Sequence, residues 1–398
     1  MGSHRFDESD IGVDVIVVGA RVAGASTALL LARAGMRVMM IDRSEEGADT
    51  VSTHALMRPA VSLLARWGVL DEVVAAGTPA VRSTSFHYPD GRITVPIKAA
   101  DGIDALYAPR RTVLDPILVD AARVAGVNVR FGLTATSLVR DERGRVSGVI
   151  ARGPDGRPLV LSARFVVGAD GARSSVARWV GAPRTHTGDS MMAYAYAHVP
   201  GVDDGGGYQW WFGADVAAGS IPTNHGSSCV FVGVPPRRFA DELHHDVPTG
   251  FRLELARLTP DLAERIGSVW SRDPEGFRHR VFTGATGFLR RCWGPGWALV
   301  GDAGFFKDPC TAHGITDSLL GAELLARALR AHLGTADEDG ALHEYERLRD
   351  ELGVPILRIS DRIASFACET DELRELHRSL SLAMARELAE IAGHRSAV

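Results

Sequence analysis

A strand, a glycine turn, a helix and a second strand near the start of the chain constrain its fold more than any other feature. Val13–Val18 is a run of mostly β-branched residues, which predicts a strand buried on both faces of a parallel sheet. Residues 22–34 predict a helix that stops at Gly35, and residues 36–41 predict a second strand that ends at Asp42. A β–α–β unit of this kind predicts an α/β fold.

The turn itself carries a pattern typical of nucleotide binding. Gly19-Ala20-Arg21-Val22-Ala23-Gly24 matches G-x-G-x-x-G at its first and third glycines, and Arg21 replaces the second. Such a turn exposes a helix N-terminus whose free N–H groups and positive dipole end bind a pyrophosphate. Asp42 follows 18 residues after Gly24 at a strand end, where a carboxylate can accept from ribose hydroxyls. The alternative is a purely structural glycine turn in an ordinary α/β sheet.

Two later segments repeat the arrangement of a carboxylate placed directly after a buried strand. Val166-Val167-Gly168-Ala169-Asp170-Gly171 is followed by the start of a helix, and Leu299-Val300-Gly301-Asp302 is followed downstream by Pro309, Gly314 and a long helix. The first turn alone does not distinguish NAD from FAD. Three acids at three strand ends imply a ligand long enough to reach all of them.

The rest of the chain divides into regions of different pattern. Residues 191–235 change to short aromatic-rich strands broken by Gly and Pro, which marks a second, β-rich domain. Everything after Asp317 is expected to be helical. Further expected elements are helices at 59–73, 112–125 and 251–266, strands at 127–131, 165–168 and 297–300, and a β-meander over 137–150 and 158–165. A length of 398 residues is consistent with two or three domains.

Composition excludes several classes of protein and partner. With 45% hydrophobic residues the chain can bury a large core, and a net charge of −5 does not favour a nucleic-acid partner. The four cysteines show no C-x-x-C pair and no metal-ligand spacing, so we expect no metal site and a reducing compartment. No apolar stretch is long enough for a membrane span, and we expect a cytoplasmic protein.

The three motifs, in this order, resemble those of the FAD-dependent aromatic hydroxylases, the single-component flavoprotein monooxygenases with the para-hydroxybenzoate hydroxylase fold. The likeness covers most of residues 13–350. It implies a Rossmann-like FAD-binding domain with an inserted β-sheet substrate domain and a C-terminal helical segment. The implied boundaries are 11–80, 106–182 and 281–333 for the FAD-binding domain, 81–105 and 183–280 for the substrate domain, and 334–398 for the C-terminal helices.

The resemblance also implies which residues hold the FAD. The glycine turn would bind the pyrophosphate, Asp42 the adenosine ribose and Asp302 the ribityl chain, while Asp170, Gly171 and Arg173 would serve both FAD and the path of the nicotinamide. An R-x-x-L-x-x-x-L helix corresponds to Arg111, Leu114 and Leu118. The full expected set is Gly19, Ala20, Arg21, Val22, Ala23, Gly24, Asp42, Arg43, Arg111, Asp170, Gly171, Arg173, Gly301, Asp302, Pro309, His313, Gly314 and Ile315.

Residues 309–316 have a physical rationale that is independent of the family. Reduced flavin is an anion, and helix N–H groups aimed at its charged edge stabilise that charge. The alternative is a plain Pro-initiated helix cap.

Candidates for catalysis are weaker, because each also has a structural interpretation. His54 and His225 could accept a phenol proton, and Tyr194 could contact substrate from the β-rich domain. Ser52 and Thr53 could lie near the flavin ring, and Lys307 near its edge. Other candidates of the same kind are His87, His313, Tyr196, Tyr208, Trp210, Trp211 and Phe212. A satisfied core side chain or a loop polar group is the alternative for each.

The implied reaction is hydroxylation of a small aromatic or polyketide-like molecule, with NAD(P)H reducing FAD and oxygen forming a flavin hydroperoxide. The partners are thus the substrate and molecular oxygen. The first rival is a flavin-dependent reductase or desaturase of the geranylgeranyl reductase type. The next is a flavin halogenase, a class that carries a W-x-W-x-I-P segment. The segment Gln209-Trp210-Trp211-Phe212 of this chain does not match that pattern. A non-catalytic nucleotide-binding regulator is the third. The C-terminal helices could cover the FAD domain or form a homodimer.

Overall fold

The first β–α–β unit forms the centre of an eight-stranded sheet in the computed structural model, which describes residues 12–202, 205–271 and 278–393. The strands of this sheet are β1 (Val13–Val18), β2 (Val38–Asp42), β5 (Asn128–Phe131), β6 (Thr134–Arg140), β7 (Val146–Arg152), β8 (Pro158–Gly168), β16 (Trp293–Gly294) and β17 (Trp297–Leu299). Their main order is β16-β17-β8-β1-β2-β5, and β1 pairs in parallel with β2 and β8. β6 and β7 continue from β8 as the expected antiparallel meander. The carboxyl ends of β1, β2, β8 and β17 therefore share one edge.

Helices pack against this sheet through small and branched apolar residues. Those nearest to it are α1 (Val22–Arg33), α4 (Arg111–Val124), α5 (Ser175–Trp179), α9 (Gly314–His332) and α10 (Glu338–Ala364). α4 and α9 both contact α1, and α10 contacts α9. Ala25 and Ala28 of α1 are fully buried. A methyl side chain at these positions permits the close approach of helices that the sequence pattern predicts.

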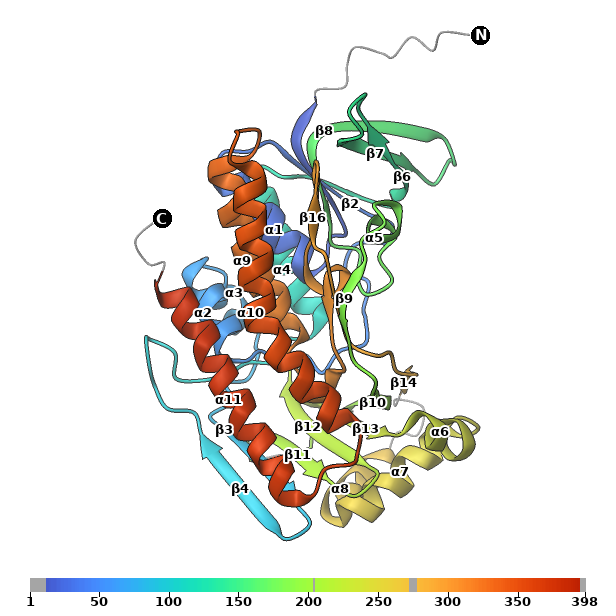
Figure 1. Ribbon diagram of the computed structural model, residues 1–398. Helices are drawn as coiled ribbons and strands as arrows, with labels where there is room; N and C mark the ends of the chain where they lie inside the picture. The colour runs from blue at the N-terminus through green and yellow to red at the C-terminus, as the bar shows by residue number, and fades with distance from the viewer. Residues whose placement is uncertain (1–11, 203–204, 272–277, 394–398) are drawn as a thin grey trace.

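The β-rich region forms a separate seven-stranded sheet (Figure 1). Its strands are β3 (Ser83–Tyr88), β4 (Gly91–Pro96), β10 (Ala193–Pro200), β11 (Tyr208–Phe212), β12 (Ala217–Thr223), β13 (Ser227–Val234) and β14 (Arg280–Phe282). Their order is β14-β10-β13-β12-β11-β3-β4. The helices α6 (Pro236–Arg238), α7 (Val247–Leu258) and α8 (Pro260–Trp270) follow β13, and α7 and α8 pack on this sheet. A small third sheet has the order β18-β15-β9, with β9 (Arg184–Thr187), β15 (Phe288–Arg290) and β18 (Phe305–Phe306).

The C-terminal helix joins the two large sheets. Figure 1 shows α10 and α11 (Thr370–Gly393) running along both halves of the molecule. His377 of α11 contacts the seven-stranded sheet through a hydrogen bond with Tyr88 and through the rings of Phe86 and Phe212. α11 also contacts α2 (Arg58–Arg66), which packs on α9 beside the eight-stranded sheet. The α/β class, the second β-rich sheet and the helical C-terminal segment are thus confirmed. None of the helices in the described ranges is long and apolar enough for a membrane span.

Several expected elements differ in their limits. The helix expected at 59–73 is two helices, α2 and α3 (Leu70–Ala75), because Gly68 between them takes a left-handed conformation with φ +67°. The helix expected at 251–266 is likewise divided into α7 and α8 where Pro260 begins the second one. The strand expected at 165–168 is the end of the longer β8. Residues 11, 203–204, 272–277 and 394–398, which the expected boundaries include, lie outside the described residues.

Candidate functional site

A cleft of about 1140 Å³ runs along the shared edge of the parallel strands and on toward the seven-stranded sheet. It brings together the three strand-end acids, Asp42, Asp170 and Asp302. Of the expected cofactor residues, those that line it are Gly19, Arg21, Val22, Ala23, Asp42, Arg43, Arg111, Asp170, Gly171, Arg173, Asp302, Pro309, Gly314 and Ile315. The other four expected residues, Ala20, Gly24, Gly301 and His313, are not part of this lining. The volume slightly exceeds the range of about 300–1,000 Å³ that is usual for small-molecule sites, which leaves room for an extended ligand.

The two glycines of the turn are required by close packing. Gly19 has φ +109°, and a Cβ there would lie 2.4 Å from the Ala169 carbonyl oxygen. A Cβ on Gly24 would lie 1.8 Å from the Gly19 carbonyl oxygen. Arg21, at the place of the middle glycine, has an extended backbone with φ −88°, which any residue adopts. Its Nη1 is buried, has no hydrogen-bond partner among the described residues and lies 3.7 Å from the Asp115 carboxylate.

Two of the acids also hold the backbone of their own loops. The Asp42 carboxylate accepts from the backbone N–H of Ala20 at 2.8 Å and of Ser44 at 2.7 Å, so it fixes the glycine turn. The Asp170 carboxylate accepts from Ser174 Oγ at 2.5 Å and from the Ser175 N–H at 2.6 Å at the start of α5. This local capping role was not part of the sequence prediction, although an acid before a helix start is a known signal for it.

Asp302 differs from the other two acids. No hydrogen bond satisfies its carboxylate within the described part of the chain, and burial raises its pKa, while the nearby charges of Lys307 and Arg111 lower it. The Arg111 guanidinium itself binds Asp115 through two hydrogen bonds of 2.7 and 2.8 Å. A carboxylate that lines the cleft and lacks a donor from the described residues fits a ligand that brings hydroxyl groups.

Only the end of the segment 309–316 belongs to the long helix at the cleft. Pro309–Thr311 is a 3₁₀ turn and Ala312 is left-handed with φ 48°, so α9 begins at Gly314. Gly314 and Ile315 line the cleft and place the first turn of this 19-residue helix there. Its free N–H groups and dipole favour negative charge at that point. His313 is turned away, and its Nε2 is hydrogen-bonded to Glu387 of α11 at 2.9 Å.

The far end of the cleft is aromatic. Tyr196 of β10, Phe282 of β14 and Phe306 of β18 line it. Phe282 and Phe306 form an edge-to-face pair with ring centroids 6.4 Å apart. Among the aromatic residues expected near a substrate, Tyr208, Trp210, Trp211 and Phe212 do not line the cleft, and they pack within or beside the seven-stranded sheet.

None of the three catalytic candidates, His54, His225 and Tyr194, is part of the cleft lining. The Tyr194 hydroxyl donates to Asp308 Oδ1 at 2.5 Å, and burial followed by the Asp308 charge raises the pKa of Tyr194. Tyr194 therefore holds the loop before α9 in place. His225 is exposed in the turn between β12 and β13. His87 is hydrogen-bonded to Gln209 at 2.9 Å.

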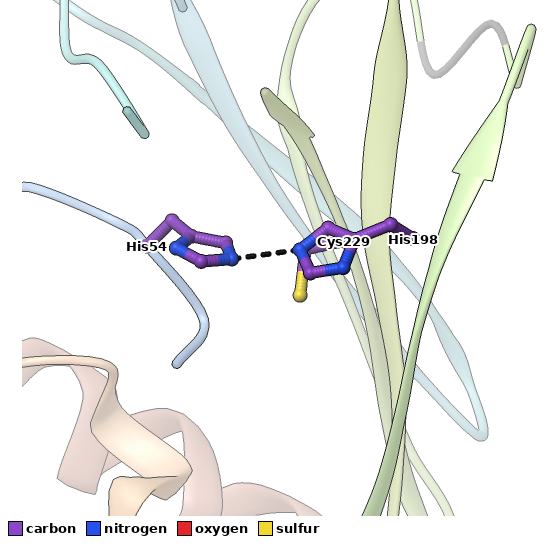
Figure 2. A group of neighbouring side chains, drawn as sticks. All are labelled: His54, His198 and Cys229. Atoms are coloured by element: carbon purple, nitrogen blue, oxygen red, sulfur yellow. Dashed lines mark hydrogen bonds between the residues drawn. The ribbon is translucent and has the colours of Figure 1, made fainter. Parts of the chain in front are cut away.

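The third candidate, His54, has a partner that the sequence did not indicate. Figure 2 shows His54 directed at His198 of β10, with Nε2 atoms 2.8 Å apart and Cys229 beside them. His54 is buried in a left-handed conformation (φ 65°) directly after Ser52 and Thr53, which line the cleft. Because the three side chains come from distant segments, residue spacing could not have grouped them.

The charge around this pair favours neutral imidazoles. Burial lowers the pKa of His54 well below its ordinary value, and the neighbouring His198 and the guanidinium of Arg111 lower it further. Burial lowers the pKa of His198 to about 4. The ring nitrogens of the two histidines and Cys229 Sγ all lie within 4.8 Å of one another, a spacing that could hold a metal ion. The positive charges nearby oppose a further cation, and the hydrogen bond between the rings accounts for their contact.

Replacement of His198 should change the pH dependence of stability. With a pKa of about 4 in the folded state and 6.5 as its ordinary value, His198 binds a proton only after unfolding within this window. Its contribution to stability is therefore lost as the pH falls from 6.5 to 4. His198→Gln should reduce this acid destabilisation by up to about 3 kcal/mol, measured by urea unfolding at pH 4.5 and 7.5. His343→Gln, at an exposed position of α10, should keep the parental slope; an equally steep slope in His198→Gln would contradict the assignment.

Comparison with known proteins gives one family and several relatives. The family model described as FAD binding domain matches residues 12–359. The digeranylgeranylglycerophospholipid reductase of Methanothrix thermoacetophila is 28% identical over 92% of this chain and 91% of its own. The protoasukamycin 4-monooxygenase of Streptomyces nodosus subsp. asukaensis is 28% identical over 86% of this chain and 85% of its own. The structure of PqsL, a probable FAD-dependent monooxygenase from Pseudomonas aeruginosa, superposes with a TM-score of 0.76 at 22% identity and covers 92% of this chain and 100% of that one.

Proposed function

The chain belongs to the FAD binding domain family, that of the FAD-dependent aromatic hydroxylases, and on that premise we propose that it hydroxylates a small aromatic or polyketide-like substrate. The proposed co-substrates are NAD(P)H and molecular oxygen. One observation carries the proposal: a single cleft joins the glycine turn and Asp302 to the aromatic side chains of Tyr196 and Phe282. FAD, when bound, supplies the electron transfer between the nicotinamide and oxygen.

The residues of the glycine turn, the strand ends and the start of α9 fit FAD. The turn at Gly19 offers a helix N-terminus for the pyrophosphate, and Asp42 retains lone pairs for the ribose after its two backbone contacts. The unsatisfied Asp302 carboxylate suits the ribityl hydroxyls. The first turn of α9 at Gly314 would face the pyrimidine edge and stabilise negative charge there.

The aromatic end of the cleft would hold the substrate and exclude water. Burial raises the pKa of Tyr196, which keeps its phenol protonated and able to donate a hydrogen bond. His54, behind Ser52 and Thr53, is proposed to relay a substrate proton to His198 along the 2.8 Å contact, and the half-buried His198 ring would release that proton to solvent. Because the pKa values of both rings are lowered, this pair can pass a proton on but does not hold one at neutral pH.

Aerobic turnover under labelled oxygen tests the hydroxylation directly. The holoenzyme is incubated with NADPH and a panel of phenols and anilines, and product mass and NADPH loss are recorded together. We expect one labelled oxygen atom in the product for each NADPH that is productively consumed, and faster NADPH oxidation when the substrate is bound. Product formation without label would overturn the proposal.

A reductase is the second candidate, because the methanogen reductase matches nearly the whole chain. Reduction of a carbon–carbon double bond needs no oxygen. Anaerobic turnover of a polyprenyl compound, with a product two mass units heavier than the substrate, would favour this candidate over hydroxylation.

A further inference from the structure

Two arginines with the same charge face each other across the small three-stranded sheet. Arg184 of β9 and Arg290 of β15 are paired in the antiparallel ladder, directly after a register irregularity between Leu289 and Arg290. Both guanidinium carbons lie over the ring of Phe288, at 4.5 Å for Arg184 and 4.6 Å for Arg290. Like charges directly opposite each other on neighbouring strands are destabilising. The ring contacts favour each cation but do not remove the repulsion between them.

No acid compensates this pair. Neither arginine makes an ion pair with a residue in the described ranges, whereas the buried Arg349 lies against Asp350 and the mostly buried Arg238 lies against Glu254. Arg290 Nη1 donates to the Ala182 carbonyl at 3.3 Å, but its Nε is buried and finds no acceptor in the part of the chain that the structure describes. Burial, and after it the Arg184 charge, lowers the pKa of Arg290. A buried N–H without an acceptor costs about 1–3 kcal/mol by itself.

The pair lies beside the aromatic end of the cleft. Both arginines line the cleft, as do Arg173 and Arg178. The Phe288 ring beneath them lies 5.9 Å from Phe306, which lines the aromatic end. The glycine turn, proposed for the FAD pyrophosphate, is on a different element, at the start of α1.

We propose that Arg184 and Arg290 form an anion site that takes a phosphate or pyrophosphate group of a ligand other than FAD. Two forked guanidinium groups can donate several hydrogen bonds to phosphate oxygens, and a phosphate would cancel the repulsion between them. The group could belong to the dinucleotide reductant or to a phosphorylated substrate. The inference rests on the proposed function only because that function assigns the glycine turn to FAD.

Binding of inorganic pyrophosphate to the FAD-loaded protein tests the site without turnover. Calorimetry should show binding to the parent, weakened by about 10- to 100-fold in Arg184→Gln and in Arg290→Gln. Arg291→Gln is the matched control, because Arg291 is exposed beside Arg290 and stacks on Trp293 outside the cleft lining. It should bind pyrophosphate as the parent does.

Thermal unfolding provides a second readout that shows whether the variants fold. Without pyrophosphate, Arg184→Gln should be at least as stable as the parent, because the substitution removes a like-charge contact. With pyrophosphate, the midpoint of the parent should rise and that of the variant should not. If Arg184 had only a structural role, Arg184→Gln would be less stable than the parent without pyrophosphate.

Kinetics then separates the two sources of the phosphate. If the reductant carries it, pyrophosphate competes with NADPH, and the KM for NADPH rises by about 10- to 100-fold in the variants. If the substrate carries it, the KM for NADPH is unchanged and the competition is with the substrate. Equal pyrophosphate binding by the parent and both cleft variants, or no binding by any of them, would overturn the site. Failure of hydroxylation alone would leave the calorimetric result intact.

Discussion

Replacing Gly24 by alanine should remove FAD from the protein and lower the free energy of unfolding by at least about 3 kcal/mol. The new methyl carbon would lie 1.8 Å from the Gly19 carbonyl oxygen and 2.9 Å from its carbon, and backbone atoms cannot move aside as a flexible side chain does. Helix α1 would have to shift away from the end of β1. The shift would displace the N–H groups that are proposed to bind the pyrophosphate.

The measurement is the ratio of flavin to protein absorbance after purification, together with urea unfolding of the apoprotein. Gly340→Ala is the matched control, because a Cβ at Gly340 of α10 meets no atom within 4 Å. This variant should keep its FAD and gain up to about 1 kcal/mol from better helix propensity. Full flavin content in Gly24→Ala would show that the turn does not position α1 for the cofactor.

Replacing Lys307 by methionine should lower the free energy of unfolding by about 3–5 kcal/mol. Lys307 is 5% exposed, lies against the Asp317 carboxylate and has its ammonium 4.7 Å from the centre of the Phe305 ring. The substitution removes the ammonium from beside Asp317, whose side chain is 8% exposed and which then keeps the His313 ring at 3.8 Å as its ionisable neighbour. Since Lys307 also lines the cleft near Asp302, we expect weaker FAD retention as well.

A double variant distinguishes charge burial from simple loss of packing. Lys307→Met with Asp317→Leu removes both charges and should recover most of the lost stability, because an apolar pair can replace a buried ion pair. Arg347→Met, which breaks an exposed pair with Glu344, should cost less than about 1 kcal/mol. A cost for Lys307→Met no larger than that of Arg347→Met would contradict the buried ion pair.

The sequence predicted the parts of this fold that depend on neighbouring residues. The strand, turn and helix from Val13 to Arg33 follow from β-branched residues, two glycines and small helical residues, and the structure has them at nearly the expected limits. The glycine at position 24 is necessary for contacts a few residues away, so its pattern is visible in the chain. The sequence did not predict where a helix is interrupted inside a helical pattern: Gly68 and Pro260 each divide a helix that was expected to be continuous.

The amino-acid sequence by itself thus determined the class of the fold, the order of its three acidic strand ends and the family resemblance that goes with them. Only the tertiary structure decided which side chains meet across long chain separations. His54 of the segment between β2 and α2 contacts His198 of β10, and Arg184 of β9 is paired with Arg290 of β15. Each such contact depends on how segments far apart in the sequence pack together. No periodicity or spacing along the chain shows which of these segments will meet.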